Sequence, residues 1–247
     1  MNGQPKRTSP WVWVGAGCLG AVVLAVGALA AVGFFGYRKV KQMETELKDP
    51  QARTAKVQKI LGTQHLPEGY HAVVGMSVPF VMDMAMLSDV EPDFRDGRQH
   101  GALGERGFIY VRTLSAGNDR EQLRDYFEGR TDDADVLRRN NIRLDRTGEV
   151  LRRGVIDMTD GAKLMYMAQR GQLDMAASRA QGITTVMLLD CKGDTRQRFG
   201  IWFGPEPKAA GKPGAGKTAA AKPDLTGTPA DEGAIREFMD HFRLCGS

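Results

Sequence analysis

The stretch VLRRGVIDMTDGAKLMYMAQ, residues 150–169, decides the fold class of this 247-residue chain. Two apolar runs flank Asp160-Gly161, and an Asp-Gly pair between two such runs is a strong sequence signal for a β-hairpin. Lys192-Gly193-Asp194 separates the next two apolar runs in the same way. The strand candidates are residues 70–76, 80–87, 107–114, 150–157, 162–169, 183–191 and 198–203. We therefore expect a mainly antiparallel sheet.

Helices are expected beside these hairpins. Residues 118–130 carry Glu121 in capping-box position, and a second short helix is expected over residues 132–139. Near the C-terminus, Thr228 and Pro229 predict the start of a helix within residues 228–247. The apolar stripe of that helix must be covered, so we expect it to dock on the sheet. With two or three packed helices, the fold class is α+β, with its main domain over residues 66–203.

The strongest single signal is WVWVGAGCLGAVVLAVGALAAVGFFGY, residues 11–37, a run of 27 residues without a charge. About 20 apolar residues suffice to cross a bilayer, and aromatic residues at both ends of the run are typical of membrane interfaces. The alternative is a cleaved signal peptide with its site near Ala28-Leu29-Ala30. The length of the run favours a retained transmembrane helix.

Basic residues flank both ends of this helix, and their count favours a cytoplasmic location for the C-terminal side, so the basic-residue rule alone leaves the orientation ambiguous. The short basic tail, residues 1–10, has the pattern of a signal anchor, and Cys191 and Cys245 form a candidate disulfide for an oxidising compartment. We therefore expect the domain outside the cytoplasm, above a helical stalk over residues 38–65. Small residues four apart in the membrane helix permit close packing with a second copy.

The octet GKPGAGKT, residues 211–218, matches the phosphate-binding loop pattern through Gly211, Gly216, Lys217 and Thr218. Such a loop needs a strand leading directly into it and a helix directly after it. Here it lies inside a Gly, Ala, Lys and Pro-rich segment, residues 204–227, and Pro223 would end any following helix. We interpret the match as chance, the segment as a flexible linker, and expect no cofactor.

Met82, Met84 and Met86 alternate along one strand candidate, as Met165 and Met167 do along another. Thioether sulfur is a soft ligand for Cu(I), but no His or Cys joins the group, so packing in the core is the favoured interpretation. The acidic residues 89–97 lack the spacing of a calcium loop and are expected to be a solvated loop.

Composition excludes other classes. The formal charge is only +4 and the basic residues are dispersed, which argues against nucleic acid as a partner. The 3 cysteines and 4 histidines do not cluster, so no zinc site is expected. No motif of a nucleophilic enzyme is present, and the catalytic residues of any enzyme would have to converge in the fold.

The order of anchor, stalk, LPEGY at residues 66–70 and strands resembles membrane-anchored proteins of GC-rich bacteria that have a PsbP/Mog1-like α+β domain. The resemblance covers residues 66–205 and implies a location in the bacterial cell envelope, but no activity and no site residues.

The leading hypothesis is therefore a single-pass protein whose extracytoplasmic domain is a non-catalytic binding or assembly module. Its expected partners are the membrane, through residues 11–37, and another envelope protein or a second copy. The alternatives are an envelope enzyme with a site invisible in sequence and a metal or small-ligand carrier that uses the methionines.

Overall fold

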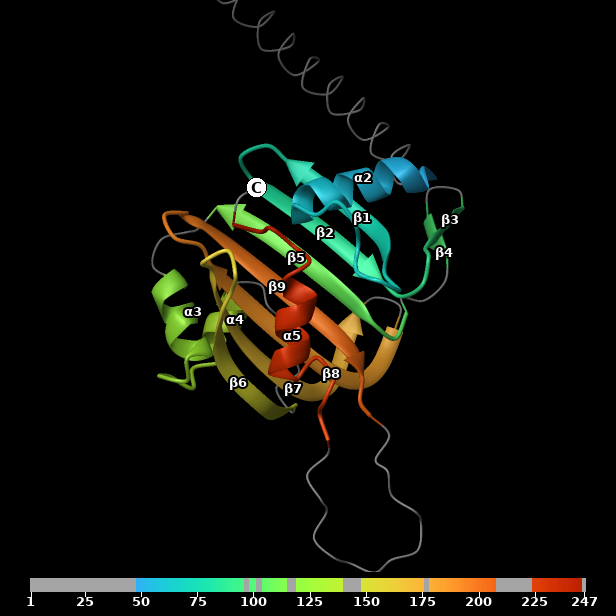
Figure 1. Ribbon diagram of the computed structural model, residues 1–247. Coiled ribbons are helices and arrows are strands. Elements are labelled where there is room, and N and C mark those ends of the chain that lie inside the picture. The colour runs from blue at the N-terminus through green and yellow to red at the C-terminus, as the bar shows by residue number, and fades with distance from the viewer. Residues whose placement is uncertain are drawn as a thin grey trace, which may run out of the picture. The chain divides into compact units, whose positions relative to one another are not determined.

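A seven-stranded antiparallel sheet with the order β1-β2-β5-β9-β8-β7-β6 is the centre of the protein in the computed structural model (Figure 1). The structure describes residues 48–95, 98–100, 104–114, 119–139, 148–175, 178–207 and 224–245. The strands are β1 (His71–Val78), β2 (Met82–Ser88), β5 (Gly107–Leu114), β6 (Glu149–Asp157), β7 (Lys163–Met175), β8 (Ser178–Asp190) and β9 (Arg196–Pro205). The expected α+β class and antiparallel sheet are confirmed.

The hairpin turns follow the signals in the sequence. Gly161 and Gly193 occupy the β6–β7 and β8–β9 turns with φ of 80° and 79°, a conformation that glycine adopts without strain. β7 and β8 extend well beyond the expected residues 162–169 and 183–191, because their polar continuations pair with each other from Arg170↔Ile183 to Met175↔Ser178. Backbone pairing, which needs no apolar alternation, lengthens both strands.

Two short strands were not foreseen. β3 (Asp93–Arg95) and β4 (Arg98–His100) form a separate two-stranded sheet, in which Asp93 pairs with His100. The first strand lies in the stretch that was expected to be a solvated loop. The strand has only 3 residues, of which Phe94 alone is apolar, so main-chain pairing rather than an apolar pattern reveals it.

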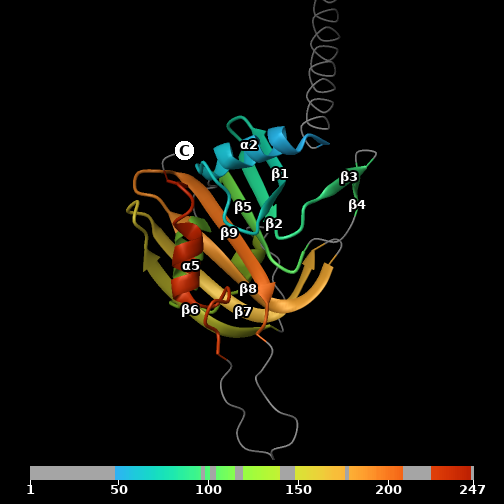
Figure 2. The ribbon, with the colours of Figure 1, turned by 45° about the vertical axis from the view of Figure 1, so that its right-hand side comes forward.

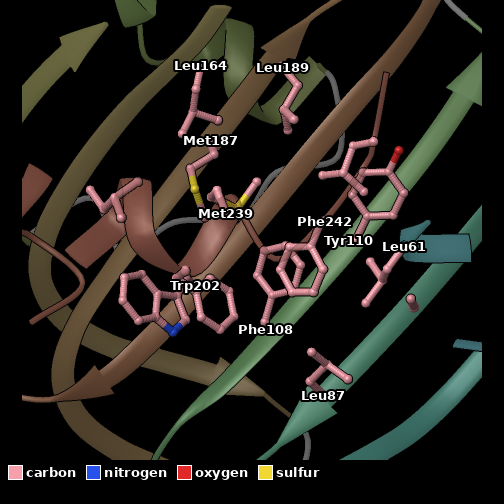
Figure 3. Close-up of a cluster of buried hydrophobic side chains, with 14 of the residues drawn as sticks. Leu61, Leu87, Phe108, Tyr110, Leu164, Met187, Leu189, Trp202, Met239 and Phe242 are labelled. Carbon is pink, nitrogen blue, oxygen red and sulfur yellow. The ribbon is translucent and has the colours of Figure 1, made fainter. Parts of the chain in front are cut away.

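The first face of the sheet is covered by α2 (Pro50–Leu61) and α5 (Glu232–Met239), which lie over β1–β2 and β8–β9 respectively (Figures 1 and 2). Aromatic rings form the centre of this core (Figure 3). Trp202 stacks on Phe238 with ring centroids 4.5 Å apart, and Phe108 stacks on Phe242 at 5.4 Å. The apolar stripe of the C-terminal helix is thus buried, and the helix docks on the sheet.

The segment LPEGY closes this core at one side. Trp202 Nε1 donates a hydrogen bond to the Tyr70 hydroxyl oxygen at 2.9 Å, and the Tyr70 ring packs on Phe238 with centroids 5.3 Å apart. Gly69 permits the turn before Tyr70 with a φ of 74°. The Pro-Glu-Gly-Tyr sequence therefore places an aromatic ring and a hydrogen-bond acceptor against the core.

Two expectations about the helices need correction. Residues 50–61 were assigned to a stalk, but α2 packs on β1, and Val57, Ile60 and Leu61 are part of the first core. A narrow apolar stripe suffices because the helix covers only the edge of the sheet. The last helix begins after Asp231, whose side chain accepts from the Gly233 backbone N–H, rather than at Pro229.

The second face of the sheet carries α3 (Asp119–Phe127) and α4 (Asp135–Arg139). Side chains of these two helices pack against β7, β8 and β9 in a second core. Its members are Leu123, Tyr126, Phe127, Val136, Leu137, Met165, Met167, Val186, Leu188 and Phe199.

No helix in the described part of the chain is both long and apolar enough to span a membrane. The expected membrane segment, residues 11–37, lies outside the described residues, as do the tail before it and residues 38–47 of the expected stalk. Of the expected linker, residues 208–223 also lie outside them.

Candidate functional site

An open apolar surface occupies the second face of the sheet over β1, β2 and β5. The register places Met76 opposite Met84 and Met84 opposite Val111, so their side chains project from the same face. The surface is here called the methionine face and comprises Val74, Met76, Val78, Met82, Met84, Met86, Ile109 and Val111. Val78 is exposed and the other seven are half-buried.

Strand alternation explains why the three β2 methionines point away from the first core. Ala85 and Leu87, which alternate with them, are fully buried beneath α2. The interpretation that Met82, Met84 and Met86 pack in the core is therefore wrong for this strand. It holds for Met165 and Met167, which are 2% and 1% exposed beneath α3 and α4.

The dimensions of the methionine face match one helix. Three strands about 4.8 Å apart place β1 and β5 about 10 Å from each other, which is about the diameter of an α-helix. β2 has 7 residues, and a helix of about 15 residues would run its length of roughly 23 Å. Methionine side chains adapt to irregular partners, which makes them common at surfaces that bind apolar helices.

A charged cluster lies behind the methionine face, on the first face of β2, β5 and β9. Arg112 contacts Asp83 at 2.8 Å, and Arg198, which is 0% exposed, donates from Nη2 to Asp194. Among the described residues, Nε and Nη1 of Arg198 and the hydroxyl of Tyr110 have no hydrogen-bond partner. This cluster holds the end of the sheet together with charges that are mostly paired.

Two pKa shifts follow from this environment. Burial disfavours ionisation of Asp194, but hydrogen bonds from Arg196 and Arg198 outweigh it and hold the pKa of this carboxyl well below its ordinary value. Burial also raises the pKa of Tyr110, although the nearby arginines oppose the rise. At neutral pH, Asp194 is therefore an ionised carboxylate beside its arginines, and the hydroxyl of Tyr110 is protonated.

A cavity of about 350 Å³ lies between α2, the segment after it and the start of β1. Arg53 Nε donates to the Ala72 carbonyl at 2.7 Å, and its guanidinium lies 5.2 Å from the centre of the Phe94 ring. Burial lowers the pKa of Arg53, against the opposing charges of Glu91 and Asp49. The lining residues are Pro50, Arg53, Thr54, Gln58, His65, Leu66, Tyr70, His71, Ala72 and Glu91.

Sequence reasoning did not find this cavity. Its polar groups come from three segments that are separate in the sequence, and the burial of Arg53 depends on tertiary packing alone. None of the methionines of β1 and β2 lines it. Within the described residues, no group of three or more His, Cys, Asp or Glu side chains is arranged to hold a metal ion.

The remaining candidate residues are dispersed. A disulfide joins Cys191 at the end of β8 to Cys245 after α5, with Cα atoms 5.4 Å apart, and so fastens the C-terminal segment to the sheet. Gly211, Gly216, Lys217 and Thr218 lie outside the described residues. Neither a protein-family model nor a curated protein matches the chain.

Proposed function

We propose that this chain is a single-pass membrane-anchored protein whose α+β domain is a non-catalytic docking module. The domain binds an amphipathic helix of another envelope protein on its methionine face. The observation that carries the proposal is the group of seven half-buried apolar side chains on β1, β2 and β5, which no helix of the described residues covers. A contiguous apolar surface that the fold leaves uncovered is typical of an interaction site.

The chemistry of the partner follows from the covered part of the same face. There, α3 and α4 bury Met165 and Met167 beneath Leu123, Phe127 and similar side chains. A helix with apolar residues at i, i+3, i+4 and i+7 would cover the open part in the same way. The Cys191–Cys245 disulfide supports a location outside the cytoplasm, because disulfides persist in oxidising compartments.

The experiment is photocrosslinking in intact cells from a reactive side chain placed at residue 84 and, as control, at residue 163. Lys163 is exposed at the start of β7 and does not belong to the methionine face. We expect residue 84 alone to crosslink one envelope protein, within a segment of helical periodicity. Crosslinks only to lipid, only to a second copy of this chain, or equally from both positions would contradict the proposal.

The carrier alternative is distinguished by replacing Met82, Met84 and Met86 with leucine together. Leucine retains the apolar volume that docking needs but removes the sulfur that binds Cu(I). We expect the triple variant, with the reactive side chain at residue 76 of the same face, to crosslink the partner as well as the parent chain with the same label does. Loss of crosslinking, together with Cu(I) binding by the parent chain in a chelator competition, would favour the carrier.

The envelope-enzyme alternative would use the cavity beside Arg53, since His65, His71 and Glu91 are groups that can transfer protons. Both histidines are exposed, so replacing them with asparagine should leave the fold intact. We expect this double variant to complement deletion of the gene as well as the parent chain does. Failure to complement with normal protein levels would favour a catalytic role.

A further inference from the structure

The β1–β2 turn exposes apolar side chains, whereas the β6–β7 and β8–β9 turns are built from polar residues and glycine. Phe80 is 93% exposed, and Val78 and Val81 beside it are exposed as well. By contrast, the β6–β7 and β8–β9 turns are built from Asp160-Gly161 and Lys192-Gly193-Asp194. The β1–β2 turn therefore departs from the turn chemistry of these two hairpins.

The backbone of this turn is also unusual. Phe80 has a φ of 63° and is the non-glycine residue with a positive φ in the described part of the chain. A side chain in this region is strained, and glycine fills the positive-φ positions of the other two turns without that strain. Both the strain and the exposed ring would be relieved by glycine, so packing within the domain does not explain Phe80.

The apolar turn has an apolar neighbour at the same end of the sheet. Met82 pairs with Thr113, and Leu114 pairs with Arg196, so the turn, the end of β5 and the start of β9 lie side by side. Leu114 is exposed there. The adjacent carboxylates, Asp83 and Asp194, form ion pairs with arginines, which limits the cost of placing this end against a less polar medium.

The short segment between the expected membrane span and α2 indicates that the less polar medium is the lipid bilayer. Residues 38–48 separate the expected membrane span from the α2 cap at Asp49, and they reach at most about 40 Å when fully extended. β1, with 8 residues, carries the chain about 25 Å from His71 to the turn. A tether of this length keeps the domain of an anchored molecule close to the bilayer, so the bilayer surface is the apolar medium that the turn can meet.

We propose that the β1–β2 turn inserts Phe80 and Val81 into the interfacial layer of the lipid bilayer. Insertion to a depth of about 5–10 Å would bury both side chains among headgroups and acyl-chain ends. The domain then has two attachments to the bilayer, the membrane helix and the turn, which restrict its rotation and fix the direction of the methionine face. This inference rests on the membrane anchor of the proposed function.

The test uses the full chain with Cys18→Ser and Val81→Cys, labelled at residue 81 with an environment-sensitive fluorophore. The disulfide keeps Cys191 and Cys245 from reacting. The labelled chain is reconstituted into vesicles of phosphatidylcholine and phosphatidylglycerol, with or without brominated acyl chains that quench on contact. The matched control carries the label at Thr226→Cys, an exposed position toward the opposite end of the sheet.

We expect brominated lipid to quench the label at residue 81 at least twofold more than the label at residue 226. Adding Phe80→Asp should reduce quenching at residue 81 to the control level, without unfolding the domain, because the Phe80 side chain makes almost no contact within it. Equal quenching at both positions, quenching that is insensitive to Phe80→Asp, or a blue shift that depends on protein density without quenching would overturn the proposal. The last result would indicate contact with a second copy.

Flotation of the same vesicles separates the two proposals. A chain that floats with the vesicles but shows no quenching at residue 81 overturns only the insertion of the turn. A chain that does not float contradicts the anchored function itself.

Discussion

The two halves of the second sheet face have the same chemistry but different cover. Over β7, Met165 and Met167 are buried beneath α3 and α4, whereas on β2, Met82, Met84 and Met86 are only half-buried. On the opposite face of β2, Ala85 and Leu87 are fully buried in the first core. Residue type alone therefore does not distinguish a covered part of the sheet face from an open part.

The same substitution made in the covered half and in the open half of the sheet face tests the difference in packing between them. Met167→Asp places an unpaired carboxylate in a dry core and should lower the free energy of unfolding by on the order of 5 kcal/mol, enough to unfold a marginal domain. Met84→Asp places the carboxylate at a half-buried position and should lower the free energy of unfolding by less than about 1 kcal/mol. Urea denaturation measures both. Similar losses would mean that the open half is packed like the covered one.

On the first face of the sheet, by contrast, the disulfide attaches the segment after α5 covalently to the end of β8. Cys191 and Cys245 close a loop with a sequence separation of 54. Replacing both with alanine should lower the free energy of unfolding by about 4 kcal/mol, mainly by freeing the unfolded chain. Reductant should lower the urea midpoint of the parent chain and leave the midpoint of the variant unchanged. A parent chain that is insensitive to reductant would contradict the prediction.

Asp194 tests the rigidity of the charged cluster behind the open half. Its pKa is lowered in the folded protein, so the stability it contributes is present above the unfolded pKa of about 4 and is lost as the pH falls below it. Asp194→Asn leaves buried Arg198 without its charged partner and should cost about 3 kcal/mol at pH 7. The gap between the parent chain and the variant should narrow from pH 5 to pH 2.5. A gap that stays constant or widens would show that Asp194 is not held ionised by its arginines.

The smallest expected effect concerns the turn that borders the methionine face. Phe80→Gly removes the strain of a positive φ and should raise the stability of the domain in detergent by up to about 1 kcal/mol. Thermal unfolding of the detergent-solubilised chain measures it, with Val81→Ala as the control that leaves the backbone strain in place. A clear loss of stability would show that the Phe80 ring packs against the domain.

The sequence was informative where local chemistry determines structure. Asp160-Gly161 and the flanking alternation predicted the β6–β7 hairpin, and the stripe with Phe238 and Phe242 predicted a docked last helix. It could not show that α2 covers β1, because Val57 and Ile60 form too narrow a stripe to distinguish a core helix from a stalk.

The site was harder to predict than the fold. Alternation correctly placed Met82, Met84 and Met86 on one side of a strand, but whether a helix covers that side depends on where α3 and α4 end. The cavity beside Arg53 and the burial of Arg198 arise from segments far apart in the chain. No local pattern encodes them.

Oxidation of methionines by dilute peroxide shows whether a partner covers the methionine face in the cell, and each chain carries its own control. In detergent and in vesicles of lipid alone, Met82, Met84 and Met86 should be oxidised much faster than Met165 and Met167, because they are more accessible. In native membranes, the account predicts that a bound partner slows the first three to nearly the rate of the last two. Unchanged rates for Met82, Met84 and Met86 in native membranes would contradict it.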